Sequence, residues 1–259
     1  MRRIAGWRAW PLAWAWIFPT CALLNAAQTS PKHNRTKLPL DVSLTAVALG
    51  GAGLLALGAQ DKKIQRHVRE FRKSPQAQNL NLNAFGNNGT LFELMGGPLA
   101  ATGLAGAFYL GGLAADSPKA KATAGLIIQA FALNSFFVLT LKEAVGRTRP
   151  ISSNSLDPNQ FKPFSGQASF PSGHTSTAFA AASVIAEQYP SWWVAGASYA
   201  TAGLVGGGRV LQDRHWTSDV AAGAILGYSS GKIAARHNKT EWSMGLDLET
   251  PGITLAYRF

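Results

Sequence analysis

Two basic residues stand just before a proline in the middle of the chain. Lys142 and Arg149 are seven residues apart, or about two turns of an α-helix, so both side chains can point to one side if the helix continues. Pro150 disfavours helical backbone at Arg149 and predicts that the helix unwinds there. Two such cations could bind phosphate oxygens. Taken alone, they are better explained as ordinary basic residues at the C-terminal end of a helix, where positive charge is favoured.

A short turn then leads into an Ala-rich helix. It consists of Pro171, Ser172, Gly173 and His174. A Ser-Gly turn at a helix start leaves backbone N–H groups without partners at the positive end of the helix dipole, and such groups bind anions. His174, in the first turn, would lie against the anion. A simple helix cap with an exposed histidine explains this motif equally well on its own.

The third group is an arginine followed by a histidine–aspartate pair. His215 and Asp219 are four residues apart on a predicted helix, so their side chains are neighbours. A carboxylate that accepts from one ring nitrogen fixes the tautomer and leaves the other lone pair available, which makes the histidine a candidate nucleophile or base. Arg209 would add a fork of donors that matches phosphate. The alternative is a structural His–Asp pair at a helix start.

Together the three groups combine three cations, a helix N-terminus and two histidines, one of them backed by an acid. No carboxylate among them is placed to bind a metal ion. The set therefore predicts a phosphoryl-transfer site that works without a metal.

The composition suits a compact protein with anionic partners. Of the 259 residues, 47% are apolar and 14% are charged, which is too apolar for a disordered chain. The mean hydropathy of +0.04 is low for a protein made mostly of membrane spans. The net charge of +11 favours nucleic acid, an anionic membrane surface or phosphorylated substrates. The sequence has no zinc-finger or RNP-like motif, which argues against nucleic acid.

The N-terminus is typical of an export signal. Arg2 and Arg3 precede an apolar stretch that ends at Leu24, and small residues follow. The rival interpretation is an uncleaved anchor helix. The single cysteine, Cys21, lies in this segment, so a processed chain would lack cysteine, which suits an oxidising compartment.

An all-α fold is predicted, with six helical segments in two groups of three around a long polar loop. The first is a nearly uncharged run at 42–59 that ends at Asp61, and a basic amphipathic stretch follows as far as Lys73. The other segments are 91–115, 121–145, 173–188, 191–208 and 216–235. Residues 74–91 and the stretch from Gly146 to Phe170 are predicted to be loops. Alternating apolar residues around Pro251-Gly252 predict a short β-hairpin in the tail.

We therefore divide the chain into four parts: 1–27, a signal peptide or N-terminal anchor; 28–40, a linker; 41–235, a helical domain; and 236–259, a tail with a hairpin. If the apolar segments at 42–59, 91–115 and 121–145 all spanned a membrane, Lys142 would lie on the cytoplasmic side, which does not suit an exported enzyme. We therefore expect a compact helical enzyme that is exported and can lie on a membrane surface.

The spacings Lys142-x6-Arg149-Pro150, Pro171-Ser172-Gly173-His174 and Arg209-x5-His215-x3-Asp219 resemble the three-part signature of the type 2 phosphatidic acid phosphatases (PAP2). That superfamily also contains bacterial class A acid phosphatases and vanadium haloperoxidases. The resemblance extends over most of residues 42–235 and implies the six-helix bundle of this superfamily. One departure is Gly208, where the family often has serine.

The resemblance also implies roles for the residues. His215 would attack phosphorus and form a phosphohistidine, Asp219 would orient His215, and His174 would act as general acid and then general base. The phosphate oxygens would be held by Lys142, Arg149, Ser172, Gly173 and Arg209. No metal or other cofactor is expected, and vanadate should act as a transition-state-like inhibitor.

Arg147 lies inside the first motif but off its predicted face, so a minor role is expected for it. Asp213 and Arg214 are expected to pair with each other or to shape the site entrance.

The implied activity is hydrolysis of a phosphate monoester or a lipid (pyro)phosphate, in the periplasm or at the outer face of the inner membrane. The sequence leaves the substrate open between a phosphorylated lipid and a small phosphate ester. Two alternatives remain: a vanadate-dependent haloperoxidase, and a phosphate- or lipid-binding protein without turnover. The intact His215–Asp219 pair argues against the second, because binding alone needs only the cations.

Overall fold

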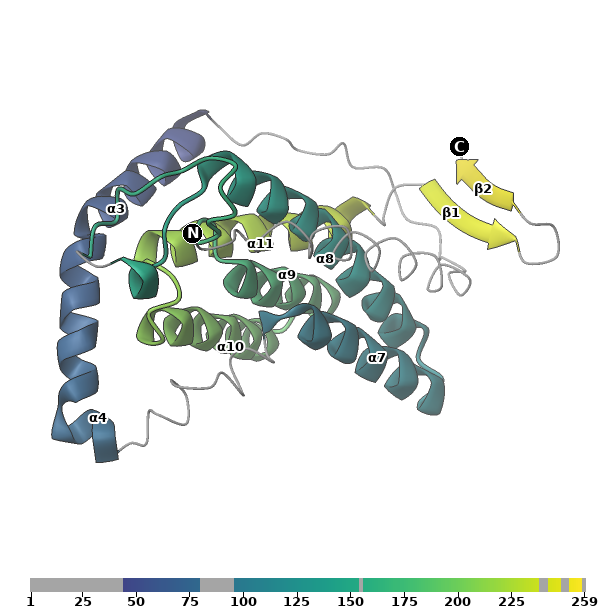
Figure 1. The fold of residues 1–259 in the computed structure, drawn as a ribbon. Helices are drawn as coiled ribbons and strands as arrows, with labels where there is room; N and C mark the ends of the chain where they lie inside the picture. Colours follow the sequence, from purple (N-terminus) through teal and green to yellow (C-terminus); the bar gives the residue numbers. More distant parts are fainter. Residues whose placement is uncertain (1–43, 80–95, 154–155, 238–241, 248–251, 258–259) are drawn as a thin grey trace, which may run out of the picture.

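The computed structural model describes residues 44–79, 96–153, 156–237, 242–247 and 252–257. The described chain is mainly α-helical (Figure 1). The helices are Leu44–Lys73 (α3), Pro75–Asn79 (α4), Pro98–Ala114 (α7), Pro118–Val145 (α8), Gly173–Gln188 (α9), Trp192–Leu211 (α10) and Thr217–His237 (α11), with a 3₁₀ turn at Pro150–Ser152 (η2). The expected export signal and linker lie outside the described residues.

The described part holds seven α-helices where six were expected. The additional one, α4, has five residues and lies in a segment predicted to be a loop. The tail contains two strands, Trp242–Asp247 (β1) and Gly252–Tyr257 (β2), which pair antiparallel with Trp242 opposite Tyr257 and Asp247 opposite Gly252.

The prediction that the first helix ends at Asp61 is wrong. The apolar run and the basic stretch after it form one continuous helix of 30 residues, α3. Asp61 is 1% exposed and pairs with Arg147, so its charge is compensated inside the protein and does not end the helix. Helix α3 packs against α10 and α11 and lies along one side of the other helices (Figure 1).

Local sequence sets the ends of α7 and α8. Each begins with a proline at its first position, where the missing N–H costs nothing. The Ser117 side chain caps α8 by accepting from the backbone N–H of Ala120 at 3.3 Å. Gly146 ends α8 in the left-handed conformation, with φ of 56°, and its missing side chain leaves room for the backbone of Lys162.

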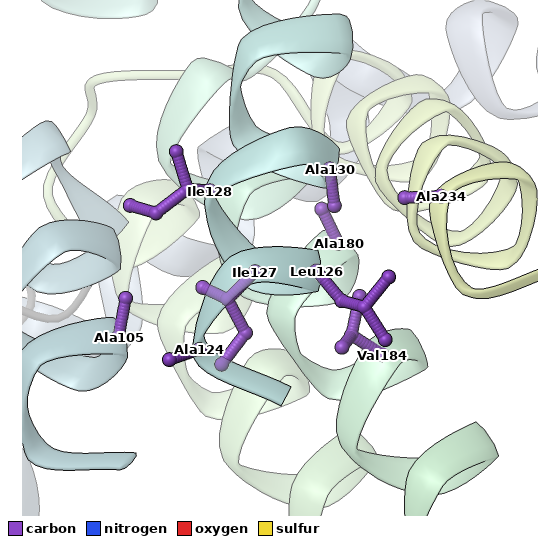
Figure 2. Close-up of a cluster of buried hydrophobic side chains, with 9 residues drawn as sticks. All are labelled: Ala105, Ala124, Leu126, Ile127, Ile128, Ala130, Ala180, Val184 and Ala234. Carbon is purple, nitrogen blue, oxygen red and sulfur yellow. The ribbon is translucent and has the colours of Figure 1, made fainter. Parts of the chain in front are cut away.

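The hydrophobic core lies where α8 meets α7, α9 and α11. Figure 2 shows side chains of α8 between Ala105 of α7 on one side and Ala234 of α11 on the other. Ala180 and Val184 of α9 complete the cluster. Helix α8 also buries Asn134, whose side chain donates to the Ser176 hydroxyl at 3.1 Å, as expected for a buried helix with polar partners.

One described helix, α8, is long and apolar enough to cross a membrane, judged by length and composition alone. Of its most apolar stretch, 44% is buried inside the molecule.

Candidate active site

The predicted site residues come together where four helices begin or end. Lys142 is in the last turn of α8, and Arg209 is in the last turn of α10. Ser172 precedes the first residue of α9, and Asp219 is in the first turn of α11. These ends lie on the same side of the bundle, beside α3 (Figure 1).

Glycines on α11 allow α9 to approach closely. A Cβ atom on Gly223 would lie 2.6 Å from the carbonyl oxygen of Ser172, and Gly227 and Gly231 face the backbone carbonyls of Ser176 and Ala180 in the same way. This contact brings the second and third motifs together, so the Ser172 amide donates to the Asp219 carbonyl oxygen at 3.0 Å.

His215 lies just before α11 and is 1% exposed. Its Nδ1 atom is 2.7 Å from the backbone carbonyl oxygen of Ser169, which can only accept, so the proton is on Nδ1 and the lone pair on Nε2. We expected Asp219 to make this hydrogen bond, but its Oδ2 atom lies 3.8 Å from Nδ1. The Ser169 carbonyl therefore fixes the tautomer, and Asp219 acts on the ring through its charge.

The Asp219 carboxylate is turned toward other donors. Oδ2 accepts from the Ser169 hydroxyl at 2.5 Å and from the Trp216 amide at 2.9 Å, and Oδ1 accepts from Arg147 at 2.6 Å. Burial alone would raise the pKa of Asp219, but His215, Arg147 and Ser169 together lower it below its usual value. Asp219 is therefore a carboxylate at neutral pH.

Both histidines have lowered pKa values and are neutral at neutral pH. Burial is the largest cause that lowers the pKa of His215 to about 4, with the charge of Lys142 also lowering it and Asp219 opposing. Burial, followed by the charge of Arg209, lowers the pKa of His174 to about 3. A neutral His215 with a free Nε2 lone pair is a candidate nucleophile.

The three cations influence the same two rings. The charges of Lys142 and Arg149 lower the pKa of both His174 and His215, and Arg209 lowers that of His174. Burial lowers the pKa of Lys142 itself to about 7, and the charge of Arg149 adds to the effect. Positive charge is thus concentrated at this site, as an anion-binding site requires.

Hydrogen bonds to backbone and side-chain oxygens hold two of the cations in place. Lys142 Nζ donates to the carbonyl oxygens of Ala168 and Pro171 at 2.6 and 2.8 Å. Arg209 is 2% exposed and donates to Gln212 at 2.9 Å. Gly173 is the first residue of α9, so its amide lies at the positive end of that helix. The structure thus gathers the eight predicted residues, within the part of the chain it describes.

Comparison with known families gives the same assignment. Residues 123–242 match the model of the PAP2 superfamily, and this segment contains all eight predicted site residues. Residues 123–242 are thus similar to the PAP2 superfamily, as the three motifs implied.

Individual relatives match over parts of their length. Over 67 residues the chain is 43% identical to the lipid A 1-phosphatase of Porphyromonas gingivalis, covering 25% of this chain and 15% of that protein. Over 90 residues it is 41% identical to the lipid A 1-phosphatase of Rhizobium etli, covering 34% of this chain and 38% of that protein. The chain thus spans well under half the length of these relatives. A crystal structure of Aquifex aeolicus LpxE is similar with a TM-score of 0.48 and 22% identity, over 67% of this chain and 93% of that one.

Sequence reasoning missed two residues that are linked to the site, Arg147 and Asp61. Arg147, expected to have a minor role, is 4% exposed and lies between two carboxylates, with Nη1 2.6 Å from Asp219 and Nη2 2.9 Å from Asp61. The isolated charge of Asp61 after a long uncharged run was the available signal.

Asp213, expected to pair with Arg214 or to shape the site entrance, binds side chains of α3. Its carboxylate accepts from three side chains of α3, namely Gln65 at 2.6 Å, Arg69 at 3.0 Å and Arg72 at 3.2 Å. Asp213 has a φ of 56° in the turn between Arg209 and His215. Helix α3 therefore anchors the turn of the third PAP2 motif.

No group of three or more His, Cys, Asp or Glu side chains in the described residues could hold a metal ion. The ionisable groups of the site itself are three cations, two histidines and one carboxylate already taken up by three donors.

Proposed function

We propose that this protein is a phosphatase that transfers a phosphoryl group from a lipid-type substrate to His215 and then to water. The observation that carries the proposal is a buried histidine whose Nε2 lone pair is set by the Ser169 carbonyl, in a site where three cations converge. Such a site can hold a phosphate dianion and supply a nucleophile without a metal ion.

The reaction has two displacements. In the first, His215 Nε2 forms a bond to phosphorus as the bond to the leaving oxygen breaks, and His174 gives its proton to that oxygen. A bound phosphate dianion raises the pKa of His174 from its low value, so that the ring can carry this proton. In the second, His174 takes a proton from water, the water oxygen bonds to phosphorus and the phosphorus–nitrogen bond breaks.

The charges stabilise each stage. Lys142, Arg149 and Arg209 hold the equatorial oxygens as charge moves onto them, together with the Ser172 side chain and the Gly173 amide. The ring of His215 becomes positive once phosphorylated, and the nearby negative charge of Asp219 favours that state.

An apolar groove supports a substrate with a hydrocarbon part. It has a volume of about 400 Å³ and lies between α7, α9 and α10. Its α9 wall begins at Thr177 and Ala178, one helical turn after His174, and its α10 wall ends at Val205, one turn before Arg209. A phosphate held at the site would place an attached chain at the mouth of this groove.

Exposed apolar side chains near the same end support contact with a membrane surface. Phe136, Phe137 and Leu141 on α8 are 51%, 40% and 36% exposed. Phe164 is 77% exposed, and its amide donates to the Glu143 carbonyl oxygen at 2.8 Å, so it lies beside the end of α8. With the export-like N-terminus, this favours action outside the cytoplasm, in the periplasm or at the outer face of the inner membrane.

The test is phosphate release by the purified full chain in EDTA, from p-nitrophenyl phosphate, phosphatidic acid and a prenyl pyrophosphate. We expect release by the wild type and none by His215→Ala, with ³²P trapped on histidine after acid-free quenching. Equal release by both proteins would refute the assignment of His215. If no substrate releases phosphate, the protein is next assayed for bromide oxidation with vanadate and peroxide. Bromide oxidation would then favour the haloperoxidase alternative.

The groove is tested by filling it. Ala181→Phe should reduce release from phosphatidic acid while leaving p-nitrophenyl phosphate turnover nearly unchanged, because only the lipid places a chain in the groove. Ala200→Phe, an exposed position on α10 outside the groove lining, is the matched control. Parallel losses on both substrates would count against a lipid chain in this groove.

A further inference from the structure

Arg147 joins two acidic residues inside the protein. Its guanidinium donates to Asp219 Oδ1 at 2.6 Å and to Asp61 Oδ2 at 2.9 Å, and also to the Ser218 hydroxyl and the Pro158 carbonyl, each at 2.8 Å. Asp61 and Asp219 are 1% and 0% exposed. A chain of buried ion pairs therefore connects Asp61 on α3, through Arg147, to the carboxylate of Asp219 beside His215.

The charges in this arrangement matter as much as its hydrogen bonds. A lone Arg147–Asp219 pair would be neutral overall, and little negative charge would then act on His215. With Asp61 on its other side, Arg147 is shared between two carboxylates, and the three groups together carry one net negative charge. This charge lies on the side where the His215 ring becomes positive.

Asp61 also fixes the start of α11. Oδ1 accepts from the Ser218 amide at 2.9 Å, and Oδ2 accepts from the Ser218 hydroxyl. Ser218 is the neighbour of Asp219 in the first turn of α11, so Asp61 holds the backbone that carries Asp219. Asp61 lies outside residues 123–242, the segment that matches the superfamily.

We propose that Asp61 is a positioning residue for His215, acting through Arg147 and Ser218 to hold Asp219 in place and to preserve its negative charge. This inference rests on the proposed phosphatase function. Asp61 touches neither the substrate nor the reacting atoms. Its effect is expected on the rate of phosphoryl transfer rather than on phosphate binding, because the phosphate-binding cations lie on other elements.

The experiment is a double-mutant cycle on the full chain, with Asp61→Asn, Arg147→Met and the double variant. Asp61→Asn keeps the shape of the side chain but removes its charge. We expect kcat to fall about tenfold or more, equivalent to about 1.4 kcal/mol of activation free energy, with KM within about twofold of the wild type. The double variant should be slower than Arg147→Met alone by clearly less than the full loss in Asp61→Asn, because Asp61 acts in part through Arg147.

Two further variants separate positioning from general destabilisation. Glu187→Gln makes the same chemical change in an ion pair with Lys232 near the far end of α9 and should leave kcat unchanged. Arg147→Lys keeps the positive charge but cannot bridge two carboxylates, so its kcat should also fall; it serves as the test if Asp61→Asn does not fold. Losses that simply add in the cycle, or a lower unfolding temperature with normal kcat, would overturn the proposal.

A readout without turnover keeps the two proposals distinguishable. The Trp216 amide donates to Asp219 and not to Asp61, so its hydrogen exchange, measured by NMR, reports the position of Asp219. Faster exchange at Trp216 in Asp61→Asn, but not in Glu187→Gln, is the expected result, and unchanged exchange would refute the positioning role. A wild type without phosphatase activity would refute the proposed function, while this exchange measurement would still decide the role of Asp61.

Discussion

Gly223 offers a direct test of how closely α9 and α11 must approach for the site to work. In Gly223→Ala, the added Cβ would lie 2.6 Å from the carbonyl oxygen of Ser172. An ordinary contact is about 3.5 Å, so the two helices must separate locally by about 0.9 Å. Ser172 stands at the start of the helix that carries His174, and Gly223 is one turn after Asp219, so the separation moves one half of the site relative to the other.

The expected magnitudes differ for stability and activity. Overpacking costs about 1–3 kcal/mol, and replacing glycine by alanine in a helix returns about 1 kcal/mol, so the net loss of unfolding free energy should be about 2 kcal/mol or less. A misplacement of about 1 Å between catalytic groups can cost about 10²-fold in rate. Gly223→Ala should therefore remain folded and lose about a hundredfold in kcat/KM.

The assay is kcat/KM on p-nitrophenyl phosphate, with urea unfolding of the same samples. Gly203→Ala on α10 is the matched control, because its added Cβ meets no atom within 4 Å, and it should be as active as the wild type and slightly more stable. If Gly223→Ala kept its activity within about threefold, the reasoning that helix contact sets the site geometry would be refuted.

Three further predictions follow from the charges and the histidines. Burial lowers the pKa of Lys142 to about 7, so KM for phosphate esters should rise as the pH rises through about 7 and the lysine loses its charge. Lys142→Arg keeps its charge and should show a flatter dependence of KM on pH. An unchanged slope would contradict a role of the Lys142 charge in phosphate binding. His174→Ala should lose far more activity on an alkyl phosphate than on p-nitrophenyl phosphate, since only the poor leaving group needs the proton, and equal losses would remove the general-acid role. The pKa values of His174 and His215 are lowered to about 3 and about 4, so below about pH 6.5 the unfolded chain takes up protons that the folded protein does not. The free energy of unfolding should therefore fall as the pH is lowered from about 6.5 to about 4. Urea titrations at several pH values measure this, and a flat profile would contradict the neutral state of both rings.

The sequence sufficed for those parts of the site that are encoded locally. Short motifs at helix ends contain Lys142, His174 and His215. The helices beside them are recognisable in the sequence from their apolar runs or from the turn residues that flank them, so both the helices and the motifs could be predicted. The hydrogen bond that fixes the His215 tautomer could not be, because its acceptor is the backbone carbonyl of Ser169, which any residue type supplies.

The contribution of α3 was hidden for a different reason. Asp61 and Arg147 are 86 positions apart, and Asp213 lies more than 140 positions from its partners on α3. In the sequence, a charge after an apolar run predicts the end of a buried segment. Only tertiary pairing makes Asp61 an interior residue, and no local pattern reports such a pairing.

The attachment of α3 bears on where this protein could be divided. A fragment cut at the borders of the matched segment, 123–242, would retain every motif residue but would leave Arg147, buried and charged, with one of its two acidic partners missing. It would also strip Asp213 of the three side chains that hold its turn. The unit that recombination or truncation must keep intact is therefore larger than the matched segment, and its border lies before Asp61.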